Sequence, residues 1–344
     1  MRMIAIFAKA ACDAPWCFIR TRGASAAMVL GWALGGVTVG PAMADYYTPT
    51  GPAVKAAAGT SGSGYTNTEG PIYDGNGGVL FGELNSTHAN DLIWRYNIAT
   101  KQAAIVVSNS GGTEGDYYNA GGQLITSDRD ARQISLRSSS NISTVQKVMA
   151  STFNGIPFNG PNDLVVDSRG GVFFTDPNFE NFANRQPQDA VYYVSPTGAV
   201  NQVLQSGNSR PNGLIISPDQ STLYVDLWAN NVIMAYNLNT AGVPTHGRVY
   251  ANATSPDGLT IDTWGDVIAA RSGGVSCWSP AGAKLFDVAI PEASYDATNV
   301  ELAGNTLYVT AGISLYSVPL AAVPEPSTLW VLAAGMALLR RRAS

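Results

Sequence analysis

Six acidic or carboxamide residues recur at matching positions along the chain, each 8 to 11 residues before the centre of a short apolar segment. They are Glu69, Glu114, Asn162, Asn212, Asp257 and Asn299. Their side chains offer only hard oxygen donors, which suit Ca²⁺ first and Mg²⁺ or Mn²⁺ next. The chain has only two histidines and three cysteines, so it cannot build a polyhistidine or multi-thiolate metal site. The pattern therefore favours a site for a hard divalent cation.

Asparagine and aspartate are also common turn residues, because their short side chains hydrogen-bond to nearby backbone groups. The six residues could serve turns rather than a cation, and their spacing alone leaves both interpretations open. Other catalytic arrangements have less support. The sequence holds no Gly-x-Ser-x-Gly nucleophile elbow, and two histidines leave few ways to build a nucleophile–histidine relay.

The apolar segments belong to a repeat that runs through the middle of the chain. Each copy joins a turn to a short strand, and the strands centre on Leu80, Leu124, Phe173, Leu223, Val267 and Leu307. These positions lie 40 to 50 residues apart, which is the length of one propeller blade. Further strands precede and follow each position, so a unit has about four strands. We therefore predict an all-β fold, a six-bladed β-propeller with four-stranded antiparallel blades, because a sandwich should not repeat six times at one period.

In such a propeller the innermost strands line a central channel, and the residues that begin these strands meet at one mouth of it. The six oxygen-bearing residues occupy these positions. Because the first two strands of a blade are antiparallel, the end of the second strand returns to the same mouth. We therefore expect substrate contacts from Asp128, Asp176 and Arg271, together with Glu114 and Asn299, although a strand-end residue could equally serve a turn. The long connection over residues 178–189 could form part of a lid.

Both ends of the chain are predicted to lie outside this fold. Residues 1–44 are typical of an export signal, with Arg20 and Arg22, an uncharged apolar stretch over residues 24–39, and Ala42-Met43-Ala44 as cleavage site. Residues 322–344 combine Val-Pro-Glu-Pro, an apolar run and three terminal arginines. This tail resembles the PEP-CTERM sorting signal, which implies processing by an exosortase and export to the surface or extracellular matrix of a Gram-negative bacterium. A membrane anchor is the alternative at either end.

The predicted propeller, residues 45–321, is acidic. Without the two ends the chain keeps 13 basic and 23 acidic residues. This balance argues against nucleic acid, whose affinity depends on cationic side chains, and is compatible with a hard cation. Cys277 is the only cysteine left in this part, so we expect a buried strand residue rather than a disulfide. His88 is expected in a surface loop.

Seven segments resemble, in order, the senescence marker protein/gluconolactonase family, which is regucalcin-like. They are Glu69-Gly70-Pro71 and residues 162–167, 174–177, 210–214, 217–219, 256–262 and 297–300. The resemblance implies a six-bladed propeller that holds a divalent metal, usually Ca²⁺, and hydrolyses lactones and related esters. By position it implies Glu69, Asn212 and Asp257 as metal ligands, with Asn162 as a fourth ligand or substrate contact. It also implies that Asp257 is the general base.

Two departures from the family pattern leave the substrate open. Blade two often ends its second strand in Cys-Glu-His or Ala-Glu-His, whereas this chain has Ser127-Asp128-Arg129, and Glu114 stands where the family more often has asparagine. Two hypotheses follow. The first is an exported, metal-dependent hydrolase of a small lactone or ester. The second is a non-catalytic Ca²⁺-binding propeller that serves as a surface or matrix binding module, with an exopolysaccharide as possible partner.

Overall fold

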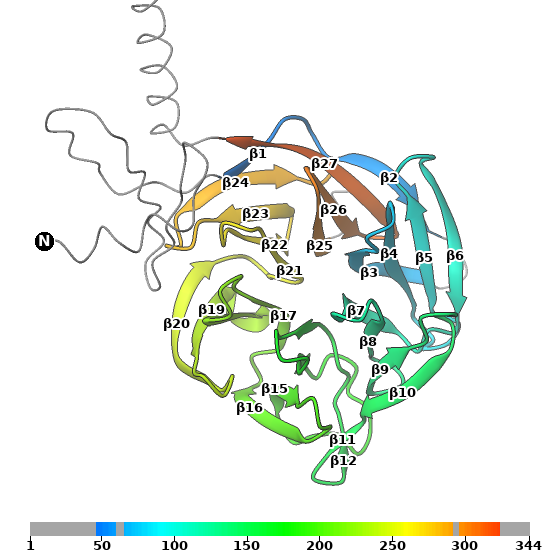
Figure 1. Ribbon diagram of the computed structural model, residues 1–344, viewed down its shortest axis with the longest axis vertical. Helices are drawn as coiled ribbons and strands as arrows, with labels where there is room; N and C mark the ends of the chain where they lie inside the picture. The colour runs from blue at the N-terminus through cyan, green and yellow to red at the C-terminus, as the bar shows by residue number, and fades with distance from the viewer. Residues whose placement is uncertain (1–45, 60–64, 292–295, 324–344) are drawn as a thin grey trace, which may run out of the picture. The chain divides into compact units, whose positions relative to one another are not determined.

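The computed structural model describes residues 46–59, 65–291 and 296–323, and within them Tyr47–Ala321 form one compact unit. Six antiparallel sheets surround a central axis, each radiating from an innermost to an outermost strand (Figure 1). This arrangement confirms the predicted six-bladed β-propeller. The described residues contain a single 3-10 turn, η1 (Trp228–Asn230), and none of their helices has the length and apolar character of a bilayer span.

The first three blades follow the chain in order from the axis outward. Blade one comprises β3 (Tyr65–Tyr73), β4 (Gly78–Asn85), β5 (Leu92–Asn97) and β6 (Gln102–Ser108). Blade two comprises β7 (Thr113–Tyr118), β8 (Leu124–Asp128), β9 (Gln133–Arg137) and β10 (Val145–Ala150). A small hairpin, β11 (Thr152–Phe153) with β12 (Ile156–Pro157), precedes blade three. Blade three comprises β13 (Leu164–Val166), β14 (Val172–Asp176), β15 (Asp189–Val194) and β16 (Val200–Gly207).

The remaining blades repeat this order, except at the end. Blade four comprises β17 (Pro211–Ile216), β18 (Thr222–Leu227), β19 (Val232–Leu238) and β20 (Pro244–Asn252). Blade five comprises β21 (Leu259–Ile261), β22 (Val267–Arg271), β23 (Gly274–Trp278) and β24 (Lys284–Ala289). Blade six comprises β25 (Ala297–Ala303), β26 (Thr306–Ala311) and β27 (Ser314–Val323), to which β1 (Tyr46–Pro49) and β2 (Val54–Ala58) add.

The ring is closed by strands from opposite ends of the described chain. β1 and β2 both pair with β27, and Thr50 N donates a hydrogen bond to Pro319 O at 2.9 Å. The early strands therefore supply the outer edge that β25–β27 lack (Figure 1). This closure stabilises the fold, because blades one and six cannot separate without breaking strand pairing. The sequence repeat did not predict β1 or β2, which are short and lack the apolar centre of the other copies.

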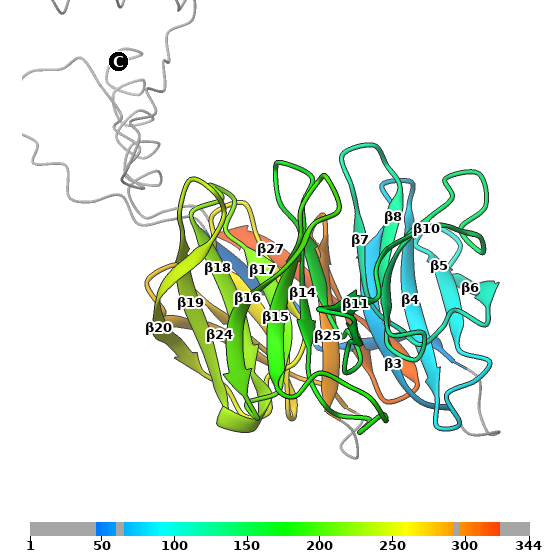
Figure 2. The same cartoon turned by 90° about the horizontal axis from the view of Figure 1, so that it is seen from below.

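The hydrophobic core of the propeller lies between neighbouring blades. The six apolar positions that mark the repeat are all at most 1% exposed, which confirms them as core residues. They lie on the second strands of the blades, whereas outer strands such as β6 and β10 are mostly exposed or half-buried. Figure 2 shows the blades side by side around the ring. Cys277 is buried on β23, as predicted.

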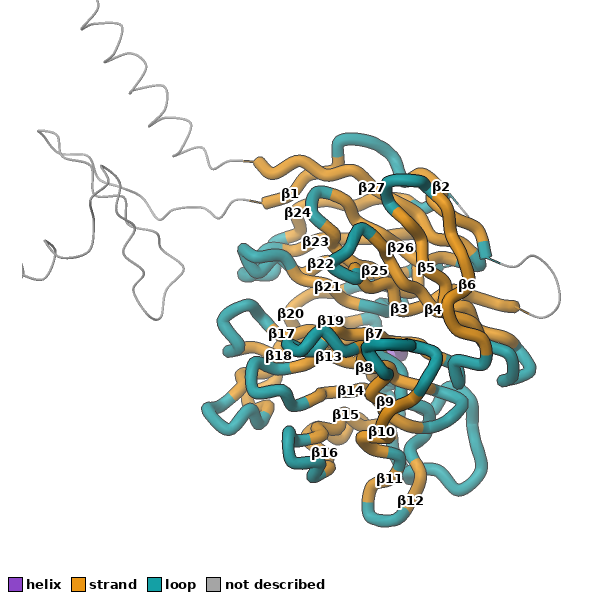
Figure 3. Tube along the Cα trace, turned by 45° about the vertical axis from the view of Figure 1, so that its right-hand side comes forward, coloured by secondary structure: helices purple, strands orange, loops and turns teal. Residues whose placement is uncertain are grey.

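Tight turns join the first two strands of most blades, and several use one design. At Asp167 the side-chain Oδ1 accepts hydrogen bonds from Arg169 N and Gly171 N, each at 2.9 Å. Gly170 adopts a φ of 84°, which a side chain would disfavour. Figure 3 shows turns and loops at the ends of the strands around the ring.

Candidate metal centre

Each of the six residues singled out by spacing lies on the innermost strand of a blade or just before it. Glu69, Glu114, Asn212 and Asn299 lie on β3, β7, β17 and β25, while Asn162 and Asp257 lie just before β13 and β21. Only Glu114 and Asn212 lie within the first two residues of their strands, and Glu69 lies in the middle of β3.

Glycines that follow four of these residues bring neighbouring blades close together. A Cβ at Gly213 would lie 2.2 Å from Asp257 O, and one at Gly70 would lie 2.4 Å from Glu114 O. Both distances are far below van der Waals contact, so a larger residue would force the strands apart. At Gly70 and Gly213 the backbone of the next blade therefore occupies the space that a side chain would need.

Hydroxyl groups on second strands fix the backbone at the candidate ligands. Thr175 Oγ1 on β14 donates to Asn212 O at 2.6 Å, across the boundary between blades three and four. Ser127 Oγ on β8 likewise donates to Asn162 O, across blades two and three. Because donor and acceptor are both buried, breaking either bond costs desolvation as well as the bond itself. These bonds therefore hold the backbone at Asn162 and Asn212 in place.

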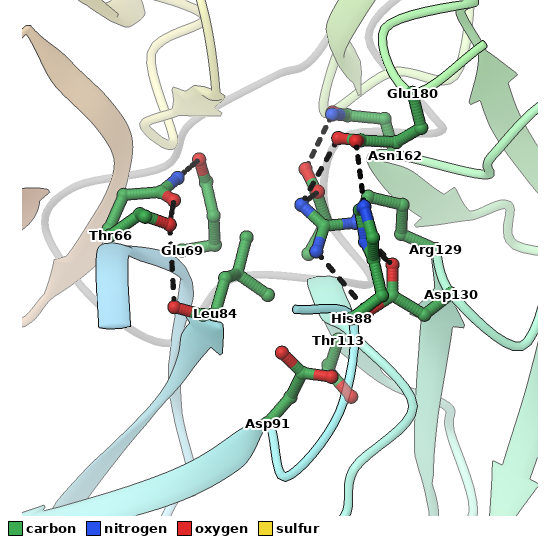
Figure 4. Close-up of polar contacts among 12 residues, drawn as sticks. Thr66, Glu69, Leu84, His88, Asp91, Thr113, Arg129, Asp130, Asn162 and Glu180 are labelled. Carbon is green, nitrogen blue, oxygen red and sulfur yellow. Dashed lines mark hydrogen bonds and ion pairs between the residues drawn. The ribbon is translucent and has the colours of Figure 1, made fainter. Parts of the chain in front are cut away.

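One cavity of about 430 Å³ gathers five of the nine predicted site residues. Glu69, Glu114, Asn162, Asn212 and Asp257 all line it. All but Asp257 are at most 9% exposed. Figure 4 shows Glu69 and Asn162 on opposite sides of the opening. The four residues predicted as metal ligands thus line one cavity.

The carboxylates of this cavity repel one another. Burial raises the pKa of Glu69 well above its ordinary value, and the charges of Asp257 and Glu114 raise it further. Burial likewise raises the pKa of Asp257, with added repulsion from Glu114 and Asp163. A buried cation would relieve both effects, because it offsets the desolvation of the carboxylates and the repulsion between them.

An unsatisfied acceptor points to the same conclusion. Asn212 is 4% exposed, and its Oδ1 atom has no hydrogen-bond partner although the residue lines the cavity. Buried carbonyl oxygens without partners are rare in native proteins, and a bound ion is one of the accepted explanations. Carboxylate and amide oxygens are also the donors that Ca²⁺ prefers. The residues present therefore fit a hard divalent cation.

The other four predicted site residues do not line this cavity. Asp128 is buried in an ion pair with Arg137, 3.1 Å apart, and Asp176 accepts hydrogen bonds from Asn159 N and Gly160 N. Arg271 contacts Asp287 at 2.9 Å. Asn299 lines a separate, narrower cavity of about 40 Å³ along the channel. Asp128 and Asp176 lie at the ends of second strands as expected, but their carboxylates bind other groups of the protein. The direction of a strand does not predict these partners.

Several residues of the cavity were not predicted as site residues. Arg129 lies 2.9 Å from Glu114, and Phe179 and Trp228 contribute two aromatic rings. His88 occupies the surface loop expected for it, yet it also lines the cavity and lies 2.9 Å from Asp130. Phe179 and Glu180 come from the 178–189 connection, so this segment does border the opening. Only the unusual length of that connection could have indicated it from the sequence.

Arg129 is held by acidic neighbours. Burial alone would lower its pKa, but Glu114, Asp130 and Glu180 raise it above its ordinary value. The guanidinium in turn lowers the pKa of Glu114, although burial dominates and raises that pKa to about 7. Among the described residues that line the cavity, Arg129 is thus the one buried cationic side chain beside several carboxylates.

Comparison with known sequences agrees with this architecture. Residues 67–313 match the family described as SMP-30/Gluconolactonase/LRE-like region, and residues 322–343 match the PEP-CTERM protein-sorting motif. The first match covers most of the chain. The protein therefore belongs to the SMP-30/gluconolactonase family of six-bladed propellers, and its C-terminal segment carries a sorting motif that points to export.

Individual relatives are more distant. A gluconolactonase of Zymomonas mobilis is 34% identical over 155 residues, which is 40% of this chain and 43% of that protein. The chain thus aligns with less than half the length of this curated relative. A solved gluconolactonase of Xanthomonas campestris has a TM-score of 0.65 at 23% identity, covering 80% of this chain and 99% of that one. A calcium-binding regucalcin of Agrobacterium tumefaciens has a TM-score of 0.61 at 17% identity, covering 77% and 96%. At these identities the structural likeness supports the fold alone.

Proposed function

We propose that the protein hydrolyses lactones with a divalent cation, Ca²⁺ before Mg²⁺ or Mn²⁺, held by Glu69, Asn162, Asn212 and Asp257. The observation that carries the proposal is the buried, unpartnered Asn212 Oδ1 in the cavity that Glu69 and Asp257 also line. The names of the relatives support the choice of a lactone as substrate.

The chemistry follows from the cavity lining. A bound cation supplies a Lewis acid for the lactone carbonyl. Asp257 is the candidate base that takes a proton from the attacking water, because its carboxylate lines the cavity that would hold the cation and the substrate. The water oxygen bonds to the carbonyl carbon as the ring C–O bond breaks, and the proton taken by Asp257 passes to the ring oxygen, which leaves as a hydroxyl. The new carboxyl group then releases its own proton to the solvent. The products are a carboxylate and an alcohol within one molecule.

The rim of the cavity favours a small cyclic substrate that has an apolar ring face and hydroxyl groups. The rings of Phe179 and Trp228 meet edge to face at 5.7 Å, and the guanidinium of Arg210 lies over both. Asn67 and Asn85 line the cavity with amide groups. An apolar ring face can lie against the aromatic pair while hydroxyls bind the amides.

The charge of the lining favours a neutral substrate. Glu69, Glu114, Glu180 and Asp257 contribute carboxylates, and Arg129 contributes the one buried guanidinium among the lining residues. With one bound divalent cation, the site stays close to neutral or slightly negative. We therefore expect neutral lactones to react faster than lactones with a phosphate or carboxylate substituent.

We further propose that the protein is exported and that an exosortase-type enzyme processes its C-terminal segment. The support is the match of residues 322–343 to the PEP-CTERM motif. The predicted signal at residues 1–44 lies outside the described residues, and so does nearly all of the tail. The final location, on the cell surface or in an exopolysaccharide matrix, belongs to this proposal.

A pH-stat measurement of acid release tests the activity. Purified residues 45–321 are mixed with neutral sugar lactones and simple lactones, with Ca²⁺ or with chelator. Turnover that the chelator abolishes and Ca²⁺ restores is the expected result. Asp257→Asn should abolish turnover, while Asp219→Asn, which replaces a turn aspartate outside the cavity, should not.

Two outcomes would contradict the proposal. Turnover that survives complete metal removal would exclude the cation from the reaction. A thermal shift with Ca²⁺ but no acid release from any lactone would instead support the non-catalytic binding module.

A further inference from the structure

Arg129 occupies a position from which it reaches three carboxylates. It follows β8 directly, is 8% exposed and lines the cavity. Its Nη1 atom lies 2.9 Å from Glu114 Oε1 and 3.4 Å from Glu180 Oε1, and its Nε atom donates to Asp130 Oδ1 at 2.7 Å. Because the partners come from a strand, a turn and a long connection, the guanidinium is held in one place (Figure 4).

Glu114 connects Arg129 to Asn162. One oxygen, Oε1, accepts from Arg129, and the other, Oε2, accepts from Asn162 Nδ2 at 2.6 Å. All three residues are at most 9% exposed, so water competes little for these bonds. The carboxylate therefore bridges a fixed guanidinium and the amide of a candidate metal ligand.

This bridge decides which end of the Asn162 amide faces the cavity. With Nδ2 bound to Glu114, the carbonyl Oδ1 is the end left for a cation. The opposite orientation would place Oδ1 about 2.6 Å from a carboxylate oxygen, where two acceptors repel. A metal ligand of this type must present oxygen, because an amide nitrogen cannot donate a lone pair to a cation.

We infer that Arg129 is a positioning residue, which holds Glu114 so that Asn162 presents its carbonyl oxygen to the cation. The inference rests on the proposed function, since it assumes a divalent cation in this cavity. Neither Arg129 nor Glu114 touches the cation in this scheme. Their contribution is the orientation of a ligand, which commonly changes metal affinity by roughly 10- to 100-fold when it is lost.

His88 and Glu180 support Arg129 from the other side. His88 Nδ1 lies 2.9 Å from Asp130 Oδ1, and its Nε2 lies 3.4 Å from Glu180 Oε2. The His88 ring also meets Phe182 edge to face at 5.4 Å. Residues from blades one, two and three thus enclose the guanidinium, which limits the positions that it can adopt.

The test compares Ca²⁺ affinity in three variants, measured by competition with a chelating dye rather than by turnover. Arg129→Met removes the guanidinium that holds Glu114, so Glu114 and the Asn162 amide can both change orientation. Ca²⁺ affinity should then fall roughly 10- to 100-fold. In Arg129→Met/Glu114→Gln the neutral amide can still accept from Asn162, so affinity should return to within about threefold of the parent. Arg95→Met removes an arginine–carboxylate pair outside the cavity and should bind Ca²⁺ like the parent.

The outcomes separate this inference from the proposed function. If the parent itself binds no Ca²⁺, the proposed function fails. If the parent binds Ca²⁺ and Arg129→Met binds it equally or more tightly, Arg129 does not position a ligand and only repels the cation. A double variant as weak as Arg129→Met would also overturn the inference, because loss of packing alone would explain both. If Arg129→Met does not fold, Arg129→Lys is the substitute, with an expected intermediate loss that Glu114→Gln again rescues.

Discussion

Replacing Gly213 by alanine tests whether the close approach of two blades assembles the proposed metal centre. Gly213 follows Asn212 on β17, and its backbone has no positive φ that would strain an alanine. The added Cβ would lie 2.2 Å from Asp257 O and 2.7 Å from Asp226 Oδ2, whereas ordinary contacts begin at 3.4 Å. Blades four and five must therefore separate by roughly 1 Å, because the nearest atom is backbone and cannot rotate away.

This displacement acts on stability and on metal binding together. Overpacking of this kind costs about 1–3 kcal/mol of unfolding free energy. A shift of about 1 Å also exceeds the roughly 0.5 Å tolerance of a preorganised site. Since Asn212 and Asp257 lie on the two blades that separate, we expect Ca²⁺ affinity to fall at least about tenfold.

Urea denaturation of the metal-free protein and Ca²⁺ titration with a competing dye measure the two effects. Gly51→Ala is the matched control, because its Cβ would meet only Pro319 at an ordinary 3.4 Å. The reasoning is refuted if Gly213→Ala matches Gly51→Ala in both stability and Ca²⁺ affinity. A loss of stability with unchanged Ca²⁺ affinity would refute only the link between blade spacing and the proposed metal centre, and the overpacking argument would stand.

Three further predictions use other parts of the molecule. Glu69→Ala should lower both Ca²⁺ affinity and lactone turnover in parallel, whereas a fall in turnover at saturating Ca²⁺ with unchanged affinity would remove Glu69 from the ligands. Burial raises the pKa of Asp116 to about 8, so the folded state keeps a proton that the unfolded chain releases near pH 4. The unfolding free energy should therefore decrease as pH rises from about 4 to 8. In urea denaturation at several pH values, Asp116→Asn should show a smaller decrease. Arg137→Met breaks the buried pair with Asp128 and should cost about 3–5 kcal/mol of stability in urea denaturation, and a cost below about 1 kcal/mol would show that the pair is dispensable.

The sequence predicts the propeller because its repeat reflects packing that every blade shares. Leu80, Phe173 and Val267 recur at one period because each must fill the space between two blades. The candidate ligands follow from the same period, since a residue at a fixed distance from a core position has a fixed place along its strand. The closure by β1 and β2 breaks the repeat, and so periodicity could not predict it.

The cavity rim is less predictable because it depends on side-chain partners rather than on period. Asp128 is the last residue of β8 and Asp226 the last but one of β18, yet Asp128 binds Arg137 while Asp226 accepts from Gly213 N. Which partner a buried carboxylate takes depends on the neighbouring strand and blade. His88 and Trp228 lie in connections outside the repeat, so nothing in the spacing relates them to the cavity.

The two departures from the family pattern become one feature in three dimensions. Glu114 adds a carboxylate to the lip, and Arg129 adds a guanidinium at the end of β8, and the two side chains are 2.9 Å apart. The Glu114 carboxylate alone would increase the repulsion among the cavity carboxylates, and the Arg129 guanidinium alone would repel a metal cation. As a pair they leave the net charge of the cavity unchanged while placing a hydrogen bond on Asn162. The altered second blade is therefore compatible with a retained metal centre, and its effect on function is expected in the shape and polarity of the cavity, where the substrate is selected.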